Sequence, residues 1–311
     1  MLAIQSLPLP SEAVVRAPEE RLGQYALLRR LPAGLRAEVW LGLPPGCASL
    51  GQLVAIKAFF PHVKGPALAA LSAELSLAPR LGHSNIVRTL RVDRDGQRPF
   101  IVSEHLEGMT LRALLRRVRV ERASIGAPSL ARVLLGIVRA VCHAQRQVAT
   151  SAEKALVAQT IAADDVFITF DGAVKLLGFK AQLANIEPSG PVSTQPDPSA
   201  PAAIDALLSE HLTPELGRVL EAACSNGSRG LYGLTRIGRE LERWQAEALR
   251  SEGRGELAAL MDLMFPSARL EQRAQLEFLL EQWTSARSPG APLSSDLSDA
   301  PPASGFRTVT A

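Results

Sequence analysis

Length, composition and charge exclude several classes of protein. The chain has 311 residues, 47% of them apolar, and a net charge of +3, so it can bury the core of one two-lobed domain or of two small ones. So small a charge gives no reason to expect a nucleic-acid partner. No apolar run reaches the roughly 18–20 residues of a membrane span, and residues 1–10 lack the charged start and apolar core of a signal peptide. We therefore expect a cytoplasmic protein with no membrane partner.

The first half of the chain predicts several strands and one helix. Residues 24–31 form an apolar strand, and the polar stretch after it contains Gly34 before a second strand with Val39. Residues 54–57, Val-Ala-Ile-Lys, have the pattern of a buried strand that ends in a lysine. Residues 100–108 read as a further strand and its exit. Between these two strands, apolar residues recur at helical spacing at Leu68, Leu71, Leu75 and Leu81.

A cluster of arginines follows the strand at residues 100–108. Its members are Arg112, Arg116, Arg117, Arg119 and Arg122. One interpretation is the solvated face of a helix. The other is a docking patch for an acidic or phosphorylated partner, because the arginine fork matches phosphate geometry.

The second half begins with a long helix and continues into a hairpin. Residues 129–148 carry apolar side chains at helical spacing: Leu130, Val133, Leu134, Ile137, Val138 and Val141. Two adjacent carboxylates, Asp164 and Asp165, come before the hairpin. The hairpin segment, residues 170–180, reads Phe-Asp-Gly-Ala-Val-Lys-Leu-Leu-Gly-Phe-Lys.

Two of these segments carry a resemblance to a known family. Residues 170–180 resemble the hairpin that leads into the DFG motif of bacterial, myxobacterial-type Ser/Thr protein kinases, and residues 54–57 resemble their lysine-bearing third strand. The resemblance implies an α+β, protein-kinase-like fold with two lobes. The N-lobe would hold a five-stranded antiparallel sheet plus the αC helix, and the C-lobe would be shortened and mainly helical.

The resemblance also implies where a nucleotide would lie. Lys57 matches the lysine that holds nucleotide phosphates in the family, with Glu74 as its ion-pair partner, and the backbone at Glu104 and Leu106 matches the hinge that meets an adenine. The remaining cofactor-binding candidates are Gly34, Val39 and Ala55. Pro32 replaces the first glycine of the phosphate loop and has no N–H to offer a phosphate.

The catalytic positions depart from the family pattern. Gly178 stands where the Mg²⁺-binding Asp belongs, and glycine has no ligand atom. Thr160 replaces the catalytic base and Ala162 the phosphate-contacting residue of the catalytic loop. Only Asp165 keeps an oxygen ligand at a metal-binding position, so Asp164 and Asp165 are weak metal candidates. We expect no metal, no required cofactor, and ATP bound weakly and without Mg²⁺ if it binds.

The rest of the chain predicts a reduced C-lobe and an extension. Residues 180–203 contain five prolines and read as a loop, followed by one short helix near 202–212. Two amphipathic helices are expected at 255–265 and 270–283, with apolar faces that either pack on the parent lobe, which is the favoured interpretation, or recruit a partner. The expected domains are an N-terminal extension (1–20), the N-lobe (21–108), a truncated C-lobe (109–250), a helical extension (251–284) and a disordered tail (285–311). Thr308 and Thr310 in this tail are either unmodified, which is the favoured interpretation, or phosphate acceptors for an active kinase.

The function expected from these residues is that of a pseudokinase. It would act as a scaffold or allosteric regulator in signalling, with protein partners such as an active kinase or another signalling protein. Two alternatives stay open. One is a divergent Ser/Thr kinase or other ATP-binding phosphotransferase that uses Lys57 and Asp165 atypically, and the other is a relic with no selected role.

Overall fold

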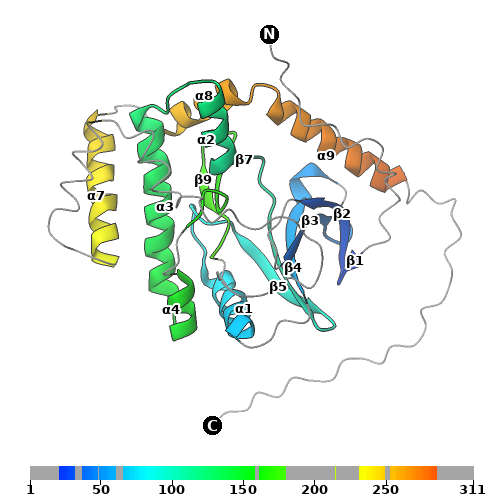
Figure 1. Ribbon diagram of the computed structural model, residues 1–311. Coiled ribbons are helices and arrows are strands. Elements are labelled where there is room, and N and C mark those ends of the chain that lie inside the picture. Colours follow the sequence, from blue (N-terminus) through cyan, green and yellow to red (C-terminus); the bar gives the residue numbers. More distant parts are fainter. Residues whose placement is uncertain are drawn as a thin grey trace, which may run out of the picture.

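The computed structural model describes residues 21–31, 37–47, 49–60, 66–157, 161–179, 214, 231–248 and 253–285. Gly34, Thr160, the loop and short helix expected within 180–212, and the tail with Thr308 and Thr310 therefore lie outside the described residues. Figure 1 shows a sheet-rich lobe on the right and a mainly helical lobe on the left. The expected α+β architecture, with one sheet-rich lobe and one mainly helical lobe, is confirmed.

The first lobe is built on one antiparallel sheet. Its strands, in the spatial order β1-β2-β3-β4-β6-β5, are β1 (Arg21–Leu22), β2 (Tyr25–Leu31), β3 (Ala37–Leu43), β4 (Val54–Phe59), β6 (Arg98–Glu104) and β5 (Thr89–Asp95). Five strands were expected. The sixth is the two-residue β1, which turns back through Gly23 (φ 56°) to pair with the start of β2.

The two faces of this sheet pack differently because side chains alternate along a strand. On one face Ile56, Phe100 and Val102 pack together with Tyr25, whose ring meets Phe100 edge-on at 6.1 Å between centroids. The other face carries Phe59 and is covered by helix α1 (Pro66–Leu77). This second face is also the face of Lys57, so the sheet directs the lysine toward the helix and the second lobe.

The second lobe surrounds one buried helix. Its helices are α2 (Leu111–Val120), α3 (Ala127–Gln147), α4 (Ser151–Val157), α7 (Leu231–Ala248) and α8 (Gly253–Met264), and a small sheet is formed by β7 (Gly108–Thr110), β8 (Val166–Thr169) and β9 (Val174–Leu176). Within the described part of the chain, α3 is the one helix with the length and apolar composition of a membrane span, and 72% of that window is buried inside the protein. Its Gly136 lets β9 approach, since a Cβ there would lie 2.8 Å from Val174.

Two helices follow α7, as the amphipathic patterns predicted, but they pack on different lobes. Helix α8 contributes Leu257, Met261 and Met264 to the core of the second lobe. Helix α9 (Ala268–Ser285) leaves that lobe and runs along the top of Figure 1 to lie on the sheet of the first lobe. The extension therefore connects the two lobes.

Candidate functional site

The centre of the candidate site is an ion pair between the sheet and α1. Lys57 on β4 pairs with Glu74 on α1, and both side chains are mostly buried, at 23% and 11% exposure. The Lys57 ammonium also lies 4.8 Å from the centre of the Phe59 ring, which adds a cation–π attraction. The structure thus brings together the two residues that sequence reasoning paired. Their ion pair holds α1 against the sheet.

The other described N-lobe candidates lie beside this pair. Val39 stands directly across from Lys57 in the β3–β4 ladder, and Ala55 stands across from Leu41. Both candidates are partly exposed on the face that carries Lys57. Together they form a small apolar surface next to the lysine.

The hinge candidate Glu104 is engaged in holding the two lobes together. Its N–H donates to the carbonyl of Arg88 at 3.0 Å, and its carboxylate accepts from the Arg88 N–H at 2.9 Å and pairs with Lys175 of β9 at 2.5 Å. The Glu104 side chain is therefore a structural tie between β6 and β9. Leu106 lies two residues on, half-buried in the hinge segment, residues 105–107, which joins β6 to β7.

The two acidic metal candidates are both engaged by protein groups. Asp164 pairs with Arg112 of α2 at 2.6 Å. The Asp165 carboxylate accepts from the Ala162 N–H at 3.3 Å, and its carbonyl accepts from the Leu177 N–H at 2.8 Å. These bonds tie the catalytic-loop segment to the end of the hairpin, so Asp165 serves the fold of the loop.

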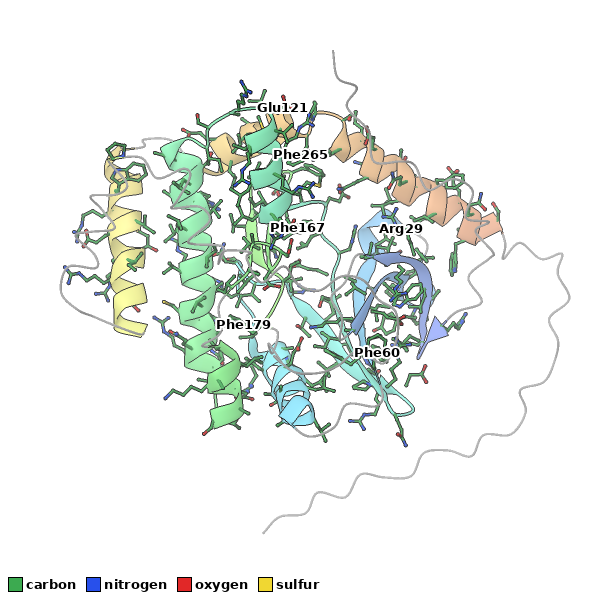
Figure 2. The ribbon with its side chains drawn as sticks, in the orientation of Figure 1. Arg29, Phe60, Glu121, Phe167, Phe179 and Phe265 are labelled. Carbon is green, nitrogen blue, oxygen red and sulfur yellow. The ribbon has the colours of Figure 1, made fainter. Side chains whose placement is uncertain are left out.

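Gly178 is the residue that the sequence resemblance matches to the family's metal-binding carboxylate. Its φ of 116° is one that side-chain-bearing residues rarely adopt, and a Cβ added there would meet nothing within 4 Å. The next residue, Phe179, is buried in the core that α1 and α3 share (labelled in Figure 2). No atom of the described residues would block a Cβ at Gly178, but the backbone there has a conformation that favours glycine over a carboxylate-bearing residue.

These residues do not fit a magnesium site. Mg²⁺ needs several oxygen ligands in near-octahedral geometry. Gly178 offers no ligand atom, and Asp164 and Asp165 are engaged as described. Throughout the described ranges, no three His, Cys, Asp or Glu side chains gather closely enough to hold a metal ion.

Sequence reasoning missed a buried carboxylate next to the site. Glu153 of α4 is 1% exposed, pairs with Arg80, and accepts from the Ser76 hydroxyl at 3.0 Å. The N–H of Ala149, at 2.6 Å, and then the Arg80 guanidinium lower the pKa of Glu153 to about 2, against the opposing effect of burial. Because Ser76 belongs to α1, this network fastens α1 to α4, the helix that comes just before the catalytic loop.

A sequence signal for Glu153 was present. Thr150 and Glu153 have the spacing of a capping box, in which an N-cap hydroxyl and a glutamate three residues later satisfy each other's backbone N–H groups. The structure shows both bonds, each at 3.2 Å. The signal predicts the helix start but not the long-range partner Arg80, which comes from another part of the chain.

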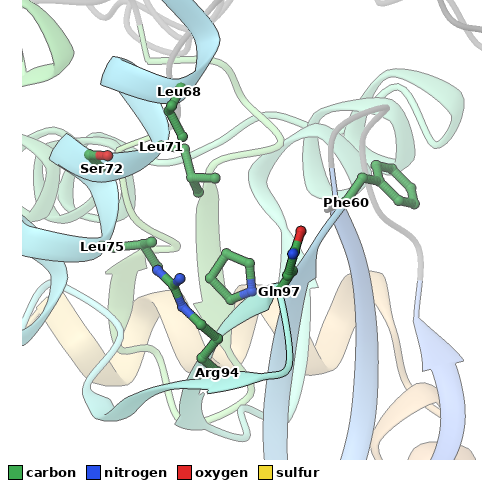
Figure 3. A pocket seen from close by; sticks show the side chains of 8 residues that line it. Phe60, Leu68, Leu71, Ser72, Leu75, Arg94 and Gln97 are labelled. Carbon is green, nitrogen blue, oxygen red and sulfur yellow. The ribbon is translucent and has the colours of Figure 1, made fainter. Parts of the chain in front are cut away.

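An apolar cavity lies on the far side of α1 from the second lobe. It has a volume of about 340 Å³ and is lined by α1, the β5–β6 hairpin and Phe60. Figure 3 shows Leu71 and Leu75 of the helix facing Arg94 and Gln97 of the hairpin. The cavity is separate from the Lys57–Glu74 pair and was not anticipated.

The arginine cluster divides into structural and exposed members. Arg112 pairs with Asp164, and Arg117 pairs with Glu121 and donates to the carbonyl of Met264. Arg116 and Arg122 are exposed. Two members of the cluster therefore stabilise the fold: Arg117 joins α2 to α8, and Arg112 joins α2 to the segment that contains Asp164.

The chain is similar to known proteins over this same region. Residues 25–185 match the family described as protein tyrosine and serine/threonine kinase. The chain belongs to this family. The matched span contains Lys57, Glu74 and Gly178, so the candidate site lies inside the region that matches the family.

Curated relatives of this kinase-family protein are bacterial. Tyrosine-protein kinase MasK of Myxococcus xanthus is 29% identical over 161 residues, which is 50% of this chain and 25% of MasK. Serine/threonine-protein kinase Pkn1 of Myxococcus xanthus is 28% identical over 71% of this chain and 29% of its own length. PknL of Mycobacterium tuberculosis is 28% identical over 54% of this chain and 40% of its own. The chain thus spans well under half the length of each.

One solved structure that aligns with the chain is also a kinase domain. A crystal structure of the Mycobacterium tuberculosis PknI kinase domain aligns with a TM-score of 0.44 and 16% identity, covering 80% of this chain and 99% of that domain.

Proposed function

We propose that this kinase-family protein does not transfer phosphate and acts in bacterial signalling as a scaffold or allosteric regulator. The observation that carries the proposal is Gly178 at the place of the metal-binding carboxylate, within an otherwise intact Lys57–Glu74 frame. Phosphoryl transfer depends on metal ions that neutralise charge on the phosphates. Losing the ligand removes that contribution while leaving the fold in place.

The state of the other catalytic positions supports the proposal. Ala162 offers no charge to a phosphate, and its N–H is used by Asp165. Asp164 is neutralised by Arg112. Loss of a positioned base alone costs a factor of about 10²–10⁴ in rate, and Thr160 has no carboxylate to supply one.

The fixed position of α1 is what a regulator would use. The Lys57–Glu74 pair fastens this helix to the sheet, and the Glu153 network fastens it to α4. A helix fixed from both lobes presents one constant surface without needing a nucleotide to order it. Its partner, by this proposal, is a signalling protein such as an active kinase.

The test is phosphate incorporation from labelled ATP into the protein itself and into generic substrates, with Mg²⁺ and with Mn²⁺. We expect none above background. The informative control restores three groups at once, in the variant Thr160→Asp/Ala162→Lys/Gly178→Asp. Gain of incorporation in this variant alone supports the proposal. Time-dependent incorporation by the natural chain that disappears in Lys57→Ala would falsify it.

One observation favours a second candidate, a divergent phosphotransferase. The Lys57–Glu74 pair is formed, and active kinases need that pair in place. The same assay separates the candidates, because only the divergent enzyme loses activity in Lys57→Ala.

A further inference from the structure

Helix α9 forms a second connection between the lobes, in addition to the hinge segment between β6 and β7. It begins three residues after α8, which is packed in the core of the second lobe. It then crosses to the first lobe, where four of its side chains are buried against the sheet: Leu276, Leu279, Leu280 and Trp283. Figure 1 shows α9 spanning the upper side of the molecule, opposite α1.

One residue of α9 forms hydrogen bonds with the backbone at the end of the hinge segment, where β7 begins. The Gln272 side chain accepts a hydrogen bond from the Gly108 N–H at 3.3 Å and donates to the Gly108 carbonyl at 3.1 Å. Gly108 lies two residues beyond Leu106, the second hinge candidate. A side-chain amide that satisfies both backbone groups of one residue fixes that residue in position and orientation.

The far end of α9 covers the same sheet face that carries the nucleotide candidates. Leu41 is fully buried in the α9 cluster, and it stands directly across from Ala55 in the β3–β4 ladder. Arg29 of β2, labelled in Figure 2, adds a 3.0 Å bond to Gln275. The helix thus borders the candidate nucleotide site on its hinge side and on its sheet side.

From these contacts we infer that α9 is a strap that holds the lobes at one separation, so that the cleft closes around a nucleotide only when α9 is released. This inference rests on the proposed function, because in a regulatory protein the cleft that carries Lys57 can itself be controlled, and here α9 would control it. Kinase lobes close by hinge motion around a ligand. A packed helix that connects the two lobes next to the hinge must slide or detach before that motion occurs.

The first test measures backbone hydrogen exchange in Gln272→Ala, with Gln282→Ala as a matched control on the exposed side of the same helix. Loss of the Gln272 bond should speed exchange at Gly108 by about 2- to 12-fold, the factor that corresponds to one hydrogen bond. The control should leave the hinge unchanged. Trp283→Ala should loosen residues 268–285 and the hinge together, while α3 keeps its protection as proof that the fold persists.

The second test uses ATP as the probe, without metal, in thermal-shift titrations of the same variants. Since only the released form binds well, the apparent dissociation constant should fall by about 2- to 12-fold in Gln272→Ala and stay at the natural value in Gln282→Ala.

Two results would overturn the strap. One is hinge exchange that stays slow after α9 is loosened. The other is a loosened hinge with no gain in the ATP response. Neither result bears on phosphate transfer, so the strap and the proposed function fail separately.

Discussion

Replacing Glu153 with glutamine tests the network that joins α1 to α4. The substitution keeps the shape and the acceptor oxygen of the side chain but removes the charge that Arg80 neutralises. Because Glu153 is 1% exposed, water cannot make up for the loss. We expect the free energy of unfolding at pH 7 to fall, and the long-range connection between α1 and α4 to weaken.

The magnitude follows from the pKa of Glu153, which lies at about 2 instead of 4.5. That difference corresponds to roughly 3 kcal/mol of stability. Arg80 is 35% exposed, and solvent screening of its charge reduces the expected loss to about 2 kcal/mol. Chemical denaturation resolves a change of this size.

The pH dependence of the loss provides a sharper check. A carboxylate with a lowered pKa stabilises the folded state fully above its ordinary pKa, and this stability disappears as pH falls from about 5 toward 2. The gap between the natural chain and Glu153→Gln should therefore narrow steadily below pH 5, to less than half its size at pH 3, and close only below the folded-state pKa of about 2. The matched control is Glu277→Gln, in an exposed pair with Arg273, which should change stability by less than about 0.5 kcal/mol. A gap of the same size at pH 7 and pH 3 would refute the reasoning.

Two further substitutions probe the frame around the hinge and the hairpin. Gly108→Ala places a Cβ 2.2 Å from the carbonyl of Ile168, so β7 and β8 must separate, and unfolding should become easier by more than about 2 kcal/mol. Gly51→Ala meets nothing within 4 Å and serves as the control in the same thermal melt. Asn85→Ala removes a buried 2.9 Å bond to the carbonyl of Val174 and should cost about 1–3 kcal/mol. Equal melting temperatures for Gly108→Ala and Gly51→Ala, or an unchanged denaturation midpoint in Asn85→Ala, would contradict these expectations.

The lobes and the central ion pair were predictable because local patterns determine them. Alternating apolar residues around Lys57 and helical spacing around Glu74 gave the strand and helix, and the family resemblance gave their pairing. The hairpin before Gly178 was predictable for the same reason. Each of these features depends on residues that lie close together in the sequence or on a motif with a known geometry.

The contacts made by α9 and Glu153 could not be predicted in this way. An amphipathic pattern shows that residues 270–283 bury one face, but it does not show which surface receives that face. The receiving surface, with Leu41, Leu43 and Leu53, lies more than two hundred residues earlier in the sequence and looks like ordinary strand core. Likewise, the partner of Glu153 is an arginine that local spacing does not relate to it.

Because α9 covers the sheet, the part of the chain that must fold together is longer than the part that matches the family. The family match ends at residue 185, whereas the helix that buries Leu41 and Leu43 begins at Ala268. A recombinant fragment trimmed to the match would turn that apolar face out to solvent, and a contiguous exposed patch of this kind promotes aggregation. Soluble expression should therefore require the chain through Ser285, even though the last hundred residues of that span lie outside the family match.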